Sequence, residues 1–131
     1  MTDIQASLGI SQLKELPLFL KRRKDIAYQY SSALKESPVI LPTEHPDSTH
    51  IYYRYVVKVA GDVNNYIELL QKEGICCDRP VYRPLHHYLG LDNCRETDRV
   101  WNTALSIPIY PSLSDGDVER VIQSLKTILE D

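Results

Sequence analysis

The chain has 131 residues, of which 43% are hydrophobic and 25% are charged, and its formal net charge at pH 7 is −3. This composition is typical of one globular domain and argues against disorder. The acidic balance argues against a nucleic-acid partner, and no apolar run approaches the ~20 residues that a membrane span needs.

The cysteines and the N-terminus indicate the cellular compartment of the protein. Cys76 and Cys77 are adjacent and Cys94 makes the number odd. Adjacent cysteines rarely pair because the short link strains a disulfide. Residues 1–5 lack the basic and apolar regions of a signal peptide. We therefore expect a cytoplasmic protein that does not enter a membrane.

Two helices are predicted at the N-terminus. Thr2 and Gln5 have the spacing of a capping box, and the apolar residues that follow cover more than one face of a helix. Pro17 is expected to break or kink this helix because proline has no N–H to donate. Apolar residues resume helical spacing over about residues 18–35. We assign residues 1–16 to a helix that packs on another domain, and residues 17–131 to a small domain.

The middle of the chain alternates strand and helix patterns. Residues 51–59 are rich in β-branched and aromatic side chains and give the strongest strand signal. A helix follows Asp62 and is expected to close at Gly74 in a left-handed cap. A short strand is predicted around residues 75–79.

The C-terminal third begins with a segment dense in Pro, Tyr, His and Gly, residues 80–93, which is interpreted as an ordered loop. A helix over residues 96–104 and an extended run over residues 105–109 follow, and Pro108 predicts an edge position or a strand end. Ser114 is a typical N-cap for the last helix, which has the clearest amphipathic pattern. The order favours an α/β arrangement, either a three-layer sandwich or a small sheet with helices on one face.

No metal site is expected. Cys76 and Cys77 precede Asp78, and His86 and His87 lie beyond, but adjacent residues on a strand point to opposite faces. The two thiols therefore cannot easily hold one ion.

The segment from Arg79 to Tyr88 is the candidate binding loop. Two prolines stiffen it, and it offers two guanidinium groups, two phenols and two imidazoles within ten residues. Guanidinium groups suit phosphate or carboxylate, and aromatic rings suit a base or a sugar face. The alternative is a loop that the same groups hold in place through local hydrogen bonds and stacking.

Both ends of the chain carry a specific motif. Residues 1–10 read Met-Thr-Asp-Ile-Gln-Ala-Ser-Leu-Gly-Ile, and residues 105–115 read Leu-Ser-Ile-Pro-Ile-Tyr-Pro-Ser-Leu-Ser-Asp. With Gln12-Leu13, Arg22-Arg23, the tyrosine-rich strand, Gly74-Ile75 and Pro84-Leu85-His86, they resemble the C-terminal portion of the DegT/DnrJ/StrS family of pyridoxal-phosphate sugar aminotransferases. The resemblance covers the whole chain.

The resemblance implies a fold and an activity. The fold is α+β, the small C-terminal domain of a fold-type-I aminotransferase, with a three-stranded, mainly antiparallel sheet covered by helices and preceded by two N-terminal helices. Members transfer an amino group from glutamate or a similar donor to a keto-sugar nucleotide, using pyridoxal phosphate held by a lysine of the larger N-terminal domain. The implied partners are that missing domain, a second copy in a homodimer, and a nucleotide-sugar.

The departures from the family pattern limit the implied activity. The chain begins at the methionine of the motif, so the preceding Asn-x-Arg element is absent, and none of its lysines has the cofactor context. We therefore expect no catalytic residue, no cofactor-binding residue and no pyridoxal phosphate on this chain alone. Pro80-Val81-Tyr82 replaces the usual His-Tyr-Pro, and the candidate substrate contacts are Arg79, Tyr82 and His86. The alternative is a stand-alone binding or regulatory module that kept the fold and lost the chemistry.

Overall fold

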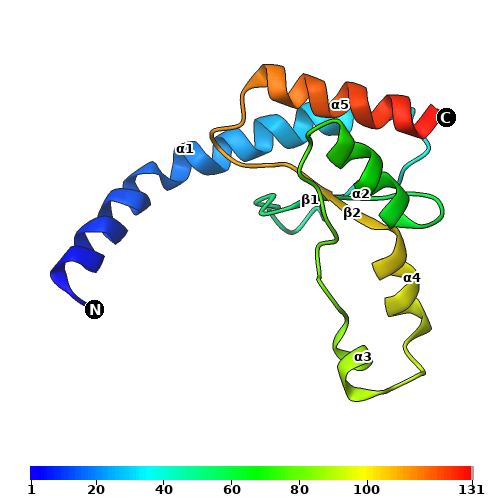
Figure 1. Cartoon of the computed structure of the whole chain (residues 1–131). Coiled ribbons are helices and arrows are strands. Elements are labelled where there is room, and N and C mark those ends of the chain that lie inside the picture. The colour runs from blue at the N-terminus through cyan, green and yellow to red at the C-terminus, as the bar shows by residue number, and fades with distance from the viewer. Residues whose placement is uncertain (131) are drawn as a thin grey trace.

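The computed structural model describes residues 1–130 and begins with one long helix, α1 (Asp3–Ala33). The predicted capping box is present, since the Thr2 and Gln5 side chains each accept a hydrogen bond from the other's backbone N–H. The prediction of two helices was wrong, because Pro17 lies inside α1. The helix absorbs the proline by curving (Figure 1), and its exposed N-terminal half lets water reach the carbonyl that loses its donor.

The sheet has two antiparallel strands within residues 1–130, β1 (Tyr55–Lys58) and β2 (Ala104–Ile107). Their register pairs Tyr55 with Ile107 and Lys58 with Ala104. β1 is shorter than the predicted strand because Tyr52 adopts a left-handed backbone conformation, with φ of 49°. Arg23 also donates hydrogen bonds to the carbonyls of Tyr52 and Tyr53, so residues before Tyr55 do not join the sheet.

The predicted third strand was wrong. Residues 75–79 contribute a single bridge, in which Asp78 and Ser106 exchange two backbone hydrogen bonds of 2.8 and 3.3 Å. The pairing stops there because the Arg79 N–H donates to the Asp78 side chain instead, and Pro80 has no N–H. Ile40 makes a similar single bridge to Lys58 on the other edge.

Four shorter helices complete the fold: α2 (Val63–Lys72), α3 (Leu85–Leu89), α4 (Arg95–Thr103) and α5 (Asp115–Glu130). The caps of α2 match the prediction, with Asp62 accepting from the N–H of Asn64 and Gly74 at φ of 74°. Ser114 likewise accepts a hydrogen bond from the Asp117 N–H at the start of α5. α3 lies in the segment predicted to be a loop.

The core lies between the sheet and the helices α1, α2 and α5. β1 alternates, with Tyr55 and Val57 buried and their neighbours half-buried, so one face of the sheet is covered by helices. Figure 1 shows the C-terminal half of α1 and α5 side by side above the sheet. Tyr30 of α1 is fully buried and its hydroxyl donates to the carbonyl of Pro108. The fold therefore has a small sheet with helices on one face.

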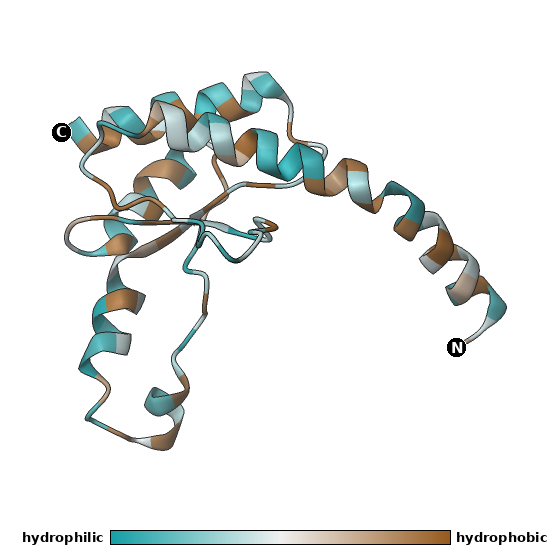
Figure 2. Ribbon diagram, turned by 180° about the vertical axis from the view of Figure 1, so that it is seen from behind, coloured by the Kyte–Doolittle hydropathy of each residue, from teal (hydrophilic) through white to brown (hydrophobic). Residues whose placement is uncertain are grey.

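Two parts of the chain extend beyond this core. One is the N-terminal half of α1, whose apolar side chains are exposed; the brown bands on this part of the ribbon in Figure 2 mark its hydrophobic residues. The other contains α3 and α4. None of the helices in residues 1–130, α1 included, combines the length and apolar character required to cross a membrane. The exposed apolar side chains of α1 are Ile4, Leu8, Ile10, Leu13, Leu16 and Leu18.

Candidate functional site

Residues 79–103 form an arm that leaves the sheet after Asp78 and returns to it at β2. Figure 1 shows α3 at the tip of this arm and α4 as its returning limb. Proline at residue 84 precedes α3, and Gly90 ends it with a left-handed φ of 66°. The arm contains all three residues that the sequence predicts to contact substrate.

Arg79 lies at the base of the arm and is already engaged by the protein. Its guanidinium donates to Asn64 Oδ1 at 2.7 Å and to the Trp101 carbonyl at 3.3 Å, and it lies 3.7 Å from a carboxylate oxygen of Asp62. The Arg79 side chain is only 13% exposed. These contacts hold Arg79 against α2 and α4.

Tyr82 lies on the outgoing limb of the arm and is 88% exposed. The adjacent residue fixes this limb, since Trp101 Nε1 donates to the Val81 carbonyl at 2.9 Å. The backbone at Tyr82 is therefore held in place while its phenol ring faces solvent, where it is free to meet a ligand.

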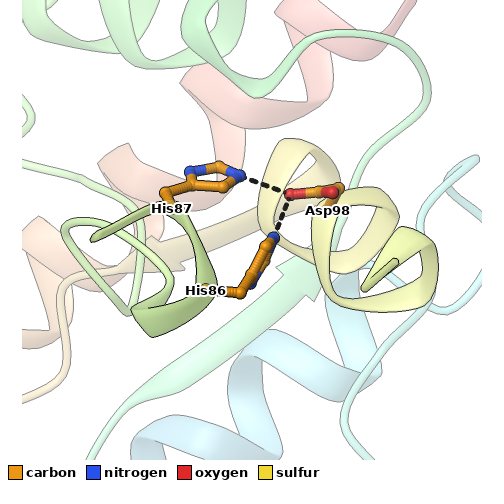
Figure 3. Close-up of side chains that lie close together, drawn as sticks. All are labelled: His86, His87 and Asp98. Carbon is orange, nitrogen blue, oxygen red and sulfur yellow. Dashed lines mark hydrogen bonds and ion pairs between the residues drawn. The ribbon is translucent and has the colours of Figure 1, made fainter. Parts of the chain in front are cut away.

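His86 and His87 of α3 both point at Asp98 of α4 (Figure 3). The Nε2 atoms of His86 and His87 lie 2.9 and 2.6 Å from the same oxygen, Asp98 Oδ1. Desolvation raises the pKa of Asp98, but hydrogen bonds from His87 and His86 and their positive potential outweigh it, so the net pKa is lowered. His86 is 7% exposed, whereas His87 is half-buried.

The three predicted residues do not form one cluster. Arg79 and His86 are connected through two rings, because the Arg79 guanidinium lies over Trp101, His87 meets the Trp101 ring edge-on, and His86 contacts His87. Tyr82 stands apart from this chain of contacts. The sequence analysis missed Asp98, because an acidic residue in the first turn of a helix is expected from the helix dipole alone.

An apolar cleft of about 550 Å³ separates the two limbs of the arm. Its walls are mostly aliphatic and aromatic, which suits the face of a sugar or a base. Within residues 1–130, every buried side-chain nitrogen and oxygen has a hydrogen-bond partner, so no buried polar side chain there calls for a ligand. The cleft is lined by Pro80, Val81, Pro84, Leu85, Glu96, Thr97, Val100, Trp101 and Ala104.

The lysines of this chain do not fit pyridoxal phosphate. All seven lie within the described residues and none is buried, whereas a Schiff-base lysine needs a desolvated site. Lys24 lines a shallow hollow, but Asp25 and Glu44 share it and would repel the cofactor's phosphate.

Comparison with known proteins gives a consistent result. The family model for the DegT/DnrJ/EryC1/StrS aminotransferases matches residues 1–126. The Bacillus subtilis (strain 168) spore coat polysaccharide biosynthesis protein SpsC is 33% identical over 99% of this chain. The dTDP-4-dehydro-2,3,6-trideoxy-D-glucose 4-aminotransferase of Saccharopolyspora spinosa is 32% identical over 98% of the chain.

A solved structure shares the fold. Streptococcus pneumoniae Spr1654, in its PMP form, superposes with a TM-score of 0.90 at 31% identity over 99% of this chain. The same protein has also been solved in a PLP form. The chain spans only about a third of these proteins, namely 37% of SpsC, 34% of the Saccharopolyspora enzyme and 35% of Spr1654.

Proposed function

Because this chain belongs to the DegT/DnrJ/EryC1/StrS aminotransferase family, we propose that it is the small C-terminal part of a sugar aminotransferase that requires a separate lysine-bearing domain for activity. The observation that carries the proposal is that nearly the whole chain matches about a third of the length of each relative. In the complete enzyme the amino group passes from glutamate or a similar donor to a keto-sugar nucleotide. The three free thiols fit a cytoplasmic location.

The chain's contribution to the reaction is to bind the sugar-nucleotide substrate. The arm offers the guanidinium of Arg79 for an anionic group, the exposed ring of Tyr82 for a sugar or base face, and His86 at the tip. The apolar cleft beside them excludes water from one side of such a ligand. The proposed roles are binding and orientation, with proton transfer left to the lysine-bearing domain.

The N-terminal half of α1 is the proposed contact with that domain. Residues 1–16 have no part in the core of this chain. Their apolar side chains are therefore left uncovered, and Ile4, Leu8 and Leu13 are more than 60% exposed. Exposed apolar residues in such a stripe indicate a surface that another protein covers. Because the exposed apolar side chains of α1 must be covered, we expect the complete enzyme to form a homodimer, or this chain to self-associate.

A chimera tests this proposal. The C-terminal third of the Saccharopolyspora spinosa enzyme is replaced by this chain, and transamination of dTDP-4-dehydro-2,3,6-trideoxy-D-glucose is measured with and without borohydride trapping. The chimera is expected to turn over substrate and to be trapped only at a lysine of the N-terminal portion that comes from the Saccharopolyspora enzyme. The chain alone is expected to show neither activity nor a stoichiometric adduct.

Two results contradict the proposal. One is activity, or a stoichiometric borohydride adduct at one of the seven lysines, with the chain alone. The other is a folded chimera that binds pyridoxal phosphate but gives no product, which would remove the proposed role of the arm in substrate binding.

The second candidate is a stand-alone binding module, and the apolar cleft in the arm is the observation that favours it. Such a module would bind a sugar nucleotide without any partner. Calorimetric titration of the isolated chain with the same nucleotide-sugar separates the candidates, because the first requires the lysine-bearing domain to complete the pocket.

A further inference from the structure

The contact between α3 and α4 brings together two imidazoles and a carboxylate. One donor atom from each of His86, His87 and Asp98 lies within 4.8 Å of the other two. In Figure 3 both rings turn their Nε2 edge toward the same carboxylate oxygen. The two histidines are neighbours on a short helix, where adjacent side chains normally diverge by about 100°. Their convergence on one point is therefore a specific feature of the arm.

The donor set suits a particular class of ion. Two imidazole nitrogens and one carboxylate oxygen match the ligands of Zn²⁺ and related transition-metal dications, whereas Mg²⁺ and Ca²⁺ prefer oxygen ligands alone. Three protein ligands also leave a coordination position for water or another small ligand.

Neighbouring residues hold the imidazole rings of His86 and His87 in their present orientation. The His87 ring lies 5.4 Å from Trp101 in an edge-on contact, and Trp101 is fixed in turn by its hydrogen bond to the Val81 carbonyl. The backbone is fixed as well, because the His87 N–H donates to the Pro84 carbonyl and the His86 carbonyl accepts from the Leu91 N–H. Such supports lower the cost of ordering ligands around an ion.

The two nitrogen–oxygen distances must lengthen to admit the ion. Donor atoms around a tetrahedral zinc are separated by about 3.3 Å, given bonds of about 2.0–2.1 Å. The distances of 2.6 and 2.9 Å to Asp98 Oδ1 must therefore lengthen by roughly half an ångström. Asp98 is 38% exposed and has room to rotate. Each histidine coordinates through the lone pair of Nε2, so any proton there moves to Nδ1 or to solvent.

We propose that His86, His87 and Asp98 form a binding site for one transition-metal dication of the Zn²⁺ class, which cross-links α3 to α4 at the tip of the arm. The sequence predicts no metal site, and the pairing of His86 and His87 with Asp98 is the observation that departs from that prediction. The site shares His86 with the proposed substrate contacts, and its test does not use aminotransferase activity.

Fluorescence of the full chain, without a histidine tag, tests the site. The sequence has one tryptophan, Trp101, and it contacts His87, so its emission reports on ion binding at this place. Titration with Zn²⁺, which does not quench tryptophan by itself, is expected to give a saturable change at one ion per chain. Calorimetry of the same titration gives the stoichiometry independently.

Two variants and one control complete the test. His87→Gln and Asp98→Asn are expected to weaken Zn²⁺ binding by at least about tenfold, since loss of an outer-shell partner alone costs about 10–100-fold. His45→Gln is the control, because His45 also lies near a carboxylate, Asp47 at 3.8 Å, but outside the arm. Circular dichroism of each variant verifies folding. The proposal is overturned if Zn²⁺ binds with no fixed stoichiometry, or if His45→Gln weakens binding as much as the other two folded variants.

Discussion

The guanidinium carbon of Arg79 lies 4.2 Å from the centroid of the Trp101 ring. These residues stand on the two opposite limbs of the arm, 22 positions apart, and the contact closes the base of the arm against the sheet. A side chain predicted to bind ligand therefore also holds the scaffold that presents the ligand site.

Replacement of Arg79 by alanine is expected to lower the free energy of unfolding by about 1–3 kcal/mol, because it removes a largely desolvated cation–π contact and a charged hydrogen bond to Asn64. Urea denaturation followed by Trp101 fluorescence measures the change. Arg83→Ala is the matched control, since its guanidinium lies 5.0 Å from an exposed tyrosine ring, and it should change stability by less than about 0.5 kcal/mol. Equal effects from both variants would contradict the role of the Trp101 contact.

Tyr30→Phe is expected to destabilise the core by about 1–2 kcal/mol, because the part-buried Pro108 carbonyl loses its 2.8 Å hydrogen bond from the fully buried Tyr30 side chain. Thermal or urea unfolding measures the loss. Tyr28→Phe, on the same helix with a ring that is 75% exposed, should leave stability unchanged. A neutral Tyr30→Phe variant would mean that the hydroxyl adds no net stability.

Asp115 is expected to contribute stability at neutral pH and to lose that contribution in acid. A hydrogen bond from Arg22, then one from Gln29, lowers the pKa of Asp115 below its ordinary value of 3.8. A carboxyl group with a depressed folded-state pKa stabilises the fold above 3.8, and the effect is lost as the pH falls through the folded-state pKa. Asp115→Asn should therefore be less stable than the parent at pH 7, and the two should converge as the pH falls through the folded-state pKa of Asp115. A difference that is constant with pH would exclude this linkage.

The three cysteines are expected to differ in reactivity. Burial raises the pKa of the Cys77 thiol to about 11, and it is 3% exposed, so little thiolate is available at neutral pH. Cys76 is exposed and Cys94 is half-buried. Iodoacetamide at pH 7.5 should label Cys76 first and Cys77 only after unfolding, as followed by peptide mass spectrometry. Early labelling of Cys77 would show that its packing opens readily.

Charged residues on the exposed face of α1 are expected to reduce self-association. Leu8→Lys and Leu13→Lys together should shift the protein from larger species toward the monomer, because they interrupt the apolar stripe without touching the core. Light scattering over a range of concentrations measures the shift. Lys14→Glu is a charge-changing control on the same helix, and a parent protein that is already monomeric at high concentration would argue against the stripe as a contact surface.

Local signals in the sequence predicted much of the fold. The caps at Thr2, Asp62 and Gly74 involve residues at most five positions apart, and their patterns are specific. The strand ends depended on distant partners instead. Arg23 lies about 30 residues before the carbonyls of Tyr52 and Tyr53 that it binds, and no local pattern reveals such a contact.

In the candidate site, too, features with a local sequence signal could be predicted, and contacts between distant residues could not. Proline and aromatic density marked the arm as an ordered segment, and the quoted motifs placed the chain in its family. The pairing of His86 and His87 with Asp98 joins residues on two helices, and an isolated aspartate in a first helical turn carries no signal of its partners.

The unbroken course of α1 has a mechanical consequence. Its 31 residues span about 46 Å at the usual rise per residue, and they run from an exposed N-terminal turn to the buried Tyr30 in the core. A domain bound to the outer half of α1 is thus coupled to the core by a rigid lever rather than a flexible tether. A change in the curvature of α1 would therefore turn the arm relative to such a domain.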